Sequence, residues 1–150
     1  NVFPGTVLDS FEDGAAVQTD LGTLHVSGIT HPPGAVEVVI RPEHIRILAP
    51  DEVPPADDNV LNGTLLDSTD YGALHSLTFH PDGAPSSRVL EISVSDPLFH
   101  QLELRKLGRR QVLLPSHAVH IMDVPAAPPP VDQTWVSEDA PLAEDQEPLV

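Results

Sequence analysis

The chain has 150 residues, with 23 Asp or Glu against seven Lys or Arg, so its formal net charge is −16. This balance disfavours general nucleic-acid binding, which needs clustered cations, and the absence of cysteine excludes disulfides, thiolate metal sites and cysteine nucleophiles. No apolar segment approaches the roughly 18 residues of a membrane-spanning helix. Since only six residues are aromatic, the core must consist mainly of Val, Leu and Ile, which favours strands.

An internal repeat organises the first 123 residues. Residues 1–10 match residues 59–68 at seven of ten positions, with an offset of 58. Residues 34–48 match residues 108–122 more loosely, with an offset of 74. The larger second offset means that the second unit has gained residues in its middle. We therefore predict two related units, at residues 1–57 and 58–123.

Each unit is predicted to consist of short strands that alternate with turns. Leu24 and Val26 share one face of their strand, as expected for a half-buried antiparallel sheet. Pro, Asp and Gly in residues 81–85 predict a hairpin loop. The apolar and β-branched runs predict strands at residues 16–19, 23–27, 38–40, 45–48, 74–79 and 89–94.

One helix is predicted, at about residues 96–107. Asp96 is a favourable N-cap, Pro97 suits the first helical position, and Gly108 suits a left-handed C-terminal residue. Short strands with one late helix predict an all-β fold: one or more OB-like Greek-key barrels, built from two homologous repeats, with one short helix in the second repeat. The sequence leaves open whether the repeats form two separate barrels or share strands.

The last segment, residues 124–150, differs in composition from the rest. It contains six Pro and six acidic residues, and no Lys, Arg or His. Such a segment has little to bury, so we predict a disordered or loosely docked acidic tail. The alternative is a partner-binding motif around Trp135, the single tryptophan of the chain.

Two segments resemble a known family. Residues 1–7 and 34–47, the latter including Ile40-Arg41-Pro42-Glu43, resemble the C-terminal transport-associated OB (TOBE) region of bacterial ABC import ATPases. The resemblance extends over about residues 1–123. The second repeat departs from the pattern, because Leu-Pro-Ser-His at residues 114–117 replaces Ile-Arg-Pro-Glu.

The resemblance implies a non-catalytic regulatory and dimerisation domain, peripheral to the cytoplasmic face of the cell membrane. The implied partners are the upstream ATPase domain of the same parent chain, a second copy of the domain, and the membrane permease subunits. ATP and Mg²⁺ would bind the upstream domain, so no cofactor is expected in this fragment. The first residue is Asn and not Met, which suggests a piece of a longer protein.

No motif in the chain predicts catalysis. The phosphate-binding pattern G-x-x-x-x-G-K-[ST] is missing from the sequence, as is the G-x-S-x-G turn of a serine nucleophile, so we assign no catalytic residue. The eight histidines are expected to be scattered on the surface, and no metal site is predicted. His117 and His120 are close in sequence, but residues three apart on a strand point to opposite faces.

Two groups of charged residues are candidates for interaction. Pro42 cannot donate to a strand ladder, so it should start a corner at which Arg41 and Glu43 pair with each other or hold a neighbouring loop. The alternative is that Arg41 contacts the ATPase domain or a small anion. The candidate interaction residues are Arg41, Glu43 and His44 at the corner and, secondarily, Arg105, Lys106, Arg109 and Arg110 after the helix.

A stand-alone oxyanion-binding or oxyanion-sensing module, of the molybdate-like type, is the alternative function. Paired OB-like units of this kind also occur in proteins that store such anions, and hydroxyl groups can contribute to oxyanion sites. The candidate ligands at matching repeat positions are Thr6, Ser10, Thr64 and Ser68. Single-stranded nucleic acid is not an expected partner, because stacking aromatics are nearly absent.

Overall fold

A computed structural model describes residues 1–56 and 58–124 of the chain. The predicted tail therefore lies, apart from Val124, outside the described residues. No helix in the described part is both long and apolar enough to cross a membrane. The strands are β1 (Val2–Phe11), β2 (Gly14–Thr19), β3 (Gly22–Ser27), β4 (Gly34–Val39), β5 (Arg46–Ile47), β6 (Asn59–Asp70), β7 (Leu74–Pro81), β8 (Leu90–Ser95), β9 (Gly108–Leu114) and β10 (His120–Asp123). The helical elements are the 3-10 turns η1 (Pro42–His44), η2 (Leu104–Lys106) and η3 (Ser116–Ala118), and the α-helix α1 (Asp96–Gln101).

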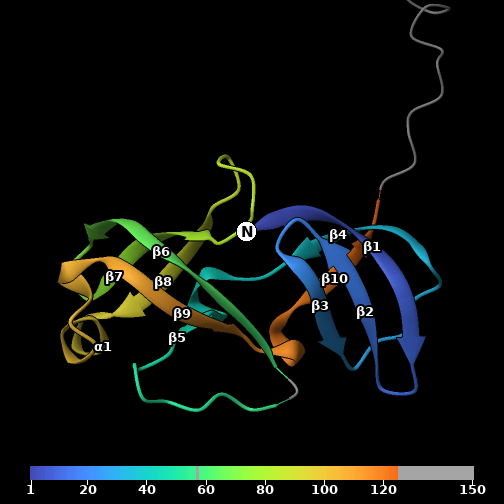
Figure 1. The fold of residues 1–150 in the computed structure, drawn as a ribbon, viewed down its shortest axis with the longest axis horizontal. Coiled ribbons are helices and arrows are strands. Elements are labelled where there is room, and N and C mark those ends of the chain that lie inside the picture. The colour runs from blue at the N-terminus through green and yellow to red at the C-terminus, as the bar shows by residue number, and fades with distance from the viewer. Residues whose placement is uncertain (57, 125–150) are drawn as a thin grey trace, which may run out of the picture.

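The strands form two antiparallel five-stranded sheets that lie side by side (Figure 1). The first sheet has the order β10-β4-β1-β2-β3, and the second has the order β5-β9-β6-β7-β8. All strand pairs in both sheets are antiparallel. The predicted all-β, OB-like fold with one short helix is thus confirmed.

The repeat seen in the sequence is reproduced in the strand register. Val2 of β1 pairs with Val39 of β4, and the residues at the two sequence offsets, Val60 and Leu113, pair in the same way between β6 and β9. Each long first strand also shifts register at the same repeat position, Leu8 in β1 and Leu66 in β6. A bulge leaves its extra residue unpaired, and both leucines are exposed.

The two repeats exchange their last strands. β5 follows β4 in the chain but pairs with β9 of the second sheet, whereas β10 follows β9 but pairs with β4 of the first sheet (Figure 1). The exchange is reciprocal, since Arg46 pairs with Leu113 and His120 pairs with Val39. Of the two possibilities that the sequence left open, the structure shows shared strands.

A 3-10 turn makes each crossing between the sheets. In η1 the His44 N–H donates to the Arg41 carbonyl at 3.0 Å, and in η3 the Ala118 N–H donates to the Pro115 carbonyl at 2.9 Å. η1 packs against β8 and η3 packs against β3, which are the edge strands of the opposite sheets. Pro42 begins η1, as the corner prediction requires.

Two asparagines at the same repeat position link the sheets. Asn59 accepts the His25 N–H at 2.6 Å and donates to the carbonyls of His25 and Leu114 at 2.9 and 3.1 Å. Asn1 accepts the Glu91 N–H at 2.7 Å and donates to the Glu91 carbonyl at 2.9 Å. Each side chain therefore satisfies the backbone of an edge strand, β3 or β8, that belongs to the other sheet.

The buried side chains form one hydrophobic cluster to which both sheets contribute. Leu24 and Val26 are buried on one face of β3, as the alternation predicts. Phe79 is among the largest fully buried side chains, and the rest of the core is mostly Val, Leu and Ile. The core thus follows from the period-two pattern of the strands.

The helix differs from the prediction in its cap and its length. Ser95 is the N-cap, and its Oγ accepts the Leu98 N–H at 3.3 Å, so the prediction of Asp96 as the cap is wrong. The α-helix ends at Gln101, because Glu103 adopts a left-handed conformation with φ of 54°, and only the 3-10 turn η2 follows. Gly108 has a φ of 93° as expected, but it begins β9 instead of capping α1.

Candidate functional site

Three of the four basic residues after the helix, Lys106, Arg109 and Arg110, line a pocket at the second sheet, whereas Arg105 is exposed and does not line it. Four of the seven Lys and Arg residues of the chain lie within residues 105–110, on η2 and the start of β9. Left-handed or otherwise positive φ angles at Glu103, Leu107 and Gly108 turn the backbone sharply through this stretch. The pocket has a volume of about 380 Å³, and its walls include Leu48, Asn62, Lys106, Arg109, Arg110 and Gln111.

The cations of this basic pocket differ in how far their charge is neutralised. Arg109 makes a two-pronged ion pair with Asp82, with both N–O distances at 2.6 Å, and this hydrogen bonding lowers the pKa of the Asp82 carboxyl. Lys106 contacts the Glu103 carboxylate at 2.8 Å, which lowers the pKa of that carboxyl. Arg110 instead donates to the Glu103 backbone carbonyl at 3.2 Å.

No carboxylate of the described residues lies within ion-pair distance of Arg110. Its guanidinium group therefore keeps donors for a ligand in the pocket. Asn62 and Gln111, joined by a side-chain hydrogen bond of 3.3 Å, add amide groups to the same wall. Arginine and amide donors around a small cavity suit an anion with several oxygen atoms.

One of the four predicted oxyanion residues lies beside these cations. Thr64 pairs with Arg109 across β6 and β9, and its Oγ1 lies 3.4 Å from the Arg109 guanidinium. Its repeat counterpart, Thr6, pairs instead with Ala35 and Gln18. Thr6 therefore has no cation opposite it on either neighbouring strand.

The two predicted serines lie beside carboxylates. The Asp9 side chain accepts the Ser10 N–H at 2.9 Å, and the Asp67 side chain accepts the Ser68 N–H at 2.8 Å. Ser10 Oγ also donates to the His31 carbonyl. The structure thus places Thr64 beside Arg109, one of the residues that line the basic pocket, and leaves Thr6, Ser10 and Ser68 apart from these cations.

The predicted corner group forms an exposed pair. Arg41 and Glu43 approach to 3.8 Å, and their side chains are 70% and 55% exposed. His44 ends η1 and is exposed as well. An exposed pair at this distance contributes little to stability, so the interaction role of these three residues stays a prediction.

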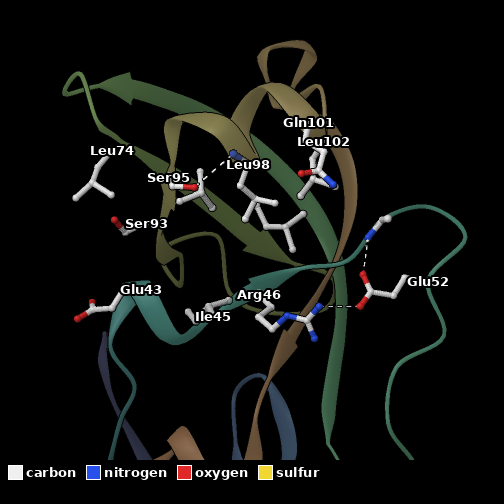
Figure 2. Close-up of a pocket in the computed structure, with 13 residues that line it drawn as sticks. Glu43, Ile45, Arg46, Glu52, Leu74, Ser93, Ser95, Leu98, Gln101 and Leu102 are labelled. Carbon is white, nitrogen blue, oxygen red and sulfur yellow. Dashed lines mark hydrogen bonds and ion pairs between the residues drawn. The ribbon is translucent and has the colours of Figure 1, made fainter.

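A larger pocket, of about 720 Å³, lies between β5, the end of β8 and α1 (Figure 2). Ile45, Leu98 and Leu102 contribute apolar walls. Arg46 is the one basic residue among the described residues that line it, and it pairs with Glu52 at 2.7 Å. A hydrogen bond from the Ala49 N–H, more than the one from Arg46, lowers the pKa of Glu52. With two carboxylates and one paired cation, this pocket suits an anion less well than the basic pocket does.

Comparison with known proteins reveals a similar fold. The crystal structure of the cytoplasmic molybdate-binding protein ModG, with molybdate bound, matches with a TM-score of 0.69 at 16% sequence identity. The match covers 83% of this chain and 96% of ModG. The chain has a ModG-like fold. No protein-family model matches the sequence, and no curated protein matches it either.

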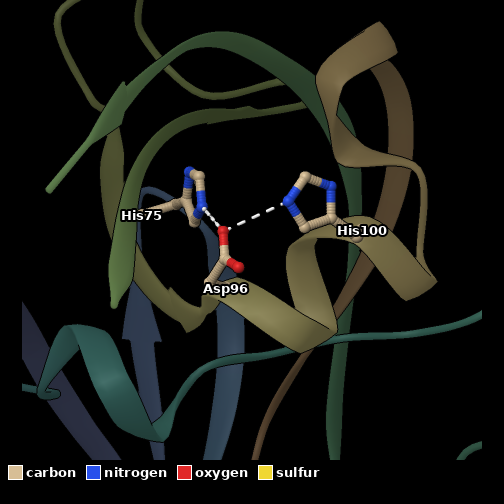
Figure 3. A group of neighbouring side chains, drawn as sticks. All are labelled: His75, Asp96 and His100. Atoms are coloured by element: carbon tan, nitrogen blue, oxygen red, sulfur yellow. Dashed lines mark hydrogen bonds and ion pairs between the residues drawn. The ribbon is translucent and has the colours of Figure 1, made fainter. Parts of the chain in front are cut away.

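The fold also brings together three side chains that the sequence analysis did not connect. One of them, His75, is buried, so the prediction that all eight histidines are scattered on the surface is wrong. His75 on β7 lies beside Asp96 and His100 on α1, and all three offer potential metal ligands (Figure 3). The helical spacing of Asp96 and His100 was visible in the sequence, but His75 is distant along the chain. Only the packing of α1 against β7 makes the group apparent.

Proposed function

We propose that this chain is a non-catalytic module that binds or senses a molybdate-like oxyanion. The observation that carries the proposal is the basic pocket of Lys106, Arg109 and Arg110, in a chain whose fold resembles that of a molybdate-binding protein. A tetrahedral oxyanion accepts hydrogen bonds on four oxygen atoms. The pocket offers guanidinium, ammonium and amide donors for them.

Arg110 has the leading role in this proposal. Arg109 already shares its charge with Asp82, and Lys106 with Glu103, so an anion competes with a carboxylate for each of them. Arg110 makes no ion pair within 4.0 Å of a carboxylate of the described residues, and it gives up a hydrogen bond to a backbone carbonyl. Thr64, next to Arg109, can add a hydroxyl group.

The test is native mass spectrometry and calorimetry of the whole chain with molybdate, tungstate, sulfate and phosphate. We expect an anion to be retained at a fixed stoichiometry by the wild type. Arg110→Gln should weaken binding roughly 10- to 100-fold, because a hydrogen bond to a charged group contributes about 1.5–3 kcal/mol. Arg41→Gln removes an exposed cation at the corner, outside this pocket, and should leave binding unchanged. The proposal fails if no anion binds, or if the two variants bind alike.

The resemblance of residues 34–47 to importer ATPases supports a second candidate. In this proposal the chain is the C-terminal regulatory and dimerisation region of an ABC import ATPase, and acts at the cytoplasmic face of the membrane through the upstream ATPase domain and the permease. Arg41→Ala in the complete ATPase should then change subunit assembly or the coupling of ATP hydrolysis to transport more than it changes folding. Unaltered assembly, hydrolysis and transport would argue against this candidate.

A further inference from the structure

We propose that His75, Asp96 and His100 form a binding site for a divalent transition-metal ion of the Zn²⁺ class. Three side chains from two elements converge there: His75 from β7, and Asp96 and His100 from α1 (Figure 3). The Nε2 atoms of His75 and His100 lie 2.7 and 3.2 Å from the same oxygen of Asp96. All three potential ligand atoms lie within 4.8 Å of one another.

These separations are close to those of a tetrahedral zinc site. Zn²⁺ binds imidazole nitrogen and carboxylate oxygen at about 2.0–2.2 Å, which places neighbouring ligand atoms roughly 3.3 Å apart. Small side-chain movements therefore suffice to admit an ion between the two rings and the carboxylate. His75 Nε2 donates its hydrogen to Asp96, and His100 Nε2 lies beside the same oxygen. On metal binding each Nε2 must offer its lone pair, with the ring proton on Nδ1.

His75 is held in a fixed orientation by its packing. Its side chain is 5% exposed, and its ring stacks on Phe99 with the centroids 3.8 Å apart and the planes 4° from parallel. Phe99 is itself buried and meets His100 edge-on. Such packing reduces the side-chain entropy that metal binding would otherwise have to overcome.

The backbone around Asp96 is also anchored. The Asp96 N–H donates to the Ala73 carbonyl at 2.9 Å, and the adjoining strand residues His75 and Val94 are paired between β7 and β8. The Asp96 carboxylate accepts the hydrogen bond from His75 Nε2 at 2.7 Å, so one of its oxygens already faces the two imidazole rings. His100 and Asp96 are spaced by four residues on one helix, so they lie on the same face.

The donor set indicates the class of metal. Two imidazoles and one carboxylate favour Zn²⁺ and its first-row neighbours over Mg²⁺ and Ca²⁺, which prefer oxygen ligands throughout. His100 and Asp96 are 55% and 43% exposed, so an ion can enter from solvent and complete its coordination with water. Bound there, the ion would hold α1 against β7 and thereby stabilise the segment that leads to the basic pocket.

The experiment is calorimetric titration of ZnCl2 into the whole chain, after chelator treatment and removal of any affinity tag. Cobalt absorption spectroscopy gives a second readout, because a low-symmetry His-His-Asp site produces visible bands. We expect one equivalent of Zn²⁺ to bind, and binding to be at least about tenfold weaker in His100→Gln, which removes an exposed ligand without opening the core. His117→Gln, an exposed histidine on η3, is the matched control and should bind as the wild type does.

The Zn²⁺ titration distinguishes a specific site from binding by scattered surface histidines. Stoichiometric binding that His100→Gln weakens and His117→Gln does not would support the site. Absence of Zn²⁺ binding by the wild type would overturn the proposal. Equal binding by the wild type and His100→Gln, or equal weakening by both variants, would also overturn it, because scattered surface histidines would then account for the metal.

Discussion

The two repeats share a backbone plan but differ in chemistry. Their long first strands have the same register and the same bulge, and each repeat gives its last strand to the other sheet. Between their third and fourth strands, however, the first repeat has a short loop and the second has α1, η2 and the basic stretch. The duplicated strands therefore provide the scaffold, and the inserted segment adds Asp96, His100 and Lys106, which complete the two proposed ligand sites together with residues of β7 and β9.

Substitution of the two glycines at the same repeat position, Gly5 and Gly63, should give the largest difference in stability between the repeats. An added Cβ at Gly63 would lie 2.3 Å from the His80 carbonyl oxygen and 2.6 Å from the Phe79 ring. At the equivalent Gly5 its nearest neighbours are valine methyl groups at 2.8 and 2.9 Å. A side-chain methyl can yield more easily than a paired backbone.

We therefore expect Gly63→Ala to lower the free energy of unfolding by about 3 kcal/mol, and Gly5→Ala by about 1 kcal/mol. Urea denaturation followed by circular dichroism measures both. Equal losses would show that the two first strands pack alike, contrary to the contacts described.

Substitution of Asn1 and Asn59, which occupy the same repeat position, should give a smaller difference in stability. Asn59 is buried and makes three hydrogen bonds, so Asn59→Ala leaves backbone groups of His25 and Leu114 without partners. We expect a loss of about 2 kcal/mol for Asn59→Ala and about 1 kcal/mol for Asn1→Ala, where water can replace the lost bonds. The midpoints of urea denaturation measure the difference, provided that the dependence of the unfolding free energy on urea concentration is the same in both variants. A larger loss of stability for Asn1→Ala than for Asn59→Ala would contradict this prediction.

The smallest expected effect concerns the two exchanged strands, β5 and β10. Only the contacts of β10 should make the stability of the protein depend on pH near neutrality. His31 lies with Nε2 2.6 Å from Asp123 of β10 and Nδ1 2.7 Å from the Pro32 carbonyl, so both ring nitrogens face acceptors and the imidazolium form fits. The hydrogen bond to Asp123, then that to Pro32, raises the pKa of His31 above its ordinary 6.5. β5 carries instead Arg46, which pairs with Glu52 at 2.7 Å, and hydrogen bonds from Ala49 and Arg46 lower the pKa of the Glu52 carboxyl.

The raised pKa of His31 determines the direction in which stability changes with pH. The contribution of His31 to stability is fully present below pH 6.5 and is lost as the pH rises through the higher pKa of the folded state. Thermal midpoints of the wild type should therefore fall slightly between pH 6 and pH 8 relative to those of His31→Gln. Parallel profiles for the two proteins would contradict this assignment.

The sequence could predict what repeats and local patterns determine. The offsets of 58 and 74 predict which residues share a repeat position, and Val60 and Leu113 do pair as Val2 and Val39 do. Pro42 predicts the corner because its ring excludes it from a ladder. These features depend on residues close in sequence or on direct comparison of the two halves.

The strand exchange and the ligand sites depend on distant contacts. A strand at residues 45–48 fits the edge of either sheet equally well by its pattern, so only the packing of both repeats decides its place. His75 and Asp96 were likewise not linked by any local spacing. The predicted helix was too long because Glu103 takes a left-handed conformation that residue preferences do not favour.

The reciprocal exchange also constrains how the chain is made. During synthesis on the ribosome, β4 emerges early, but its edge partner β10 is the last strand of the described residues to appear. Until β10 has been translated, β4 therefore lacks one of its two strand partners, and the amino-terminal sheet is incomplete at that edge. Pairing between segments so distant in the sequence slows folding, and neither half on its own can assemble a complete sheet. The exchange of strands thus makes the two similar units depend on each other to fold.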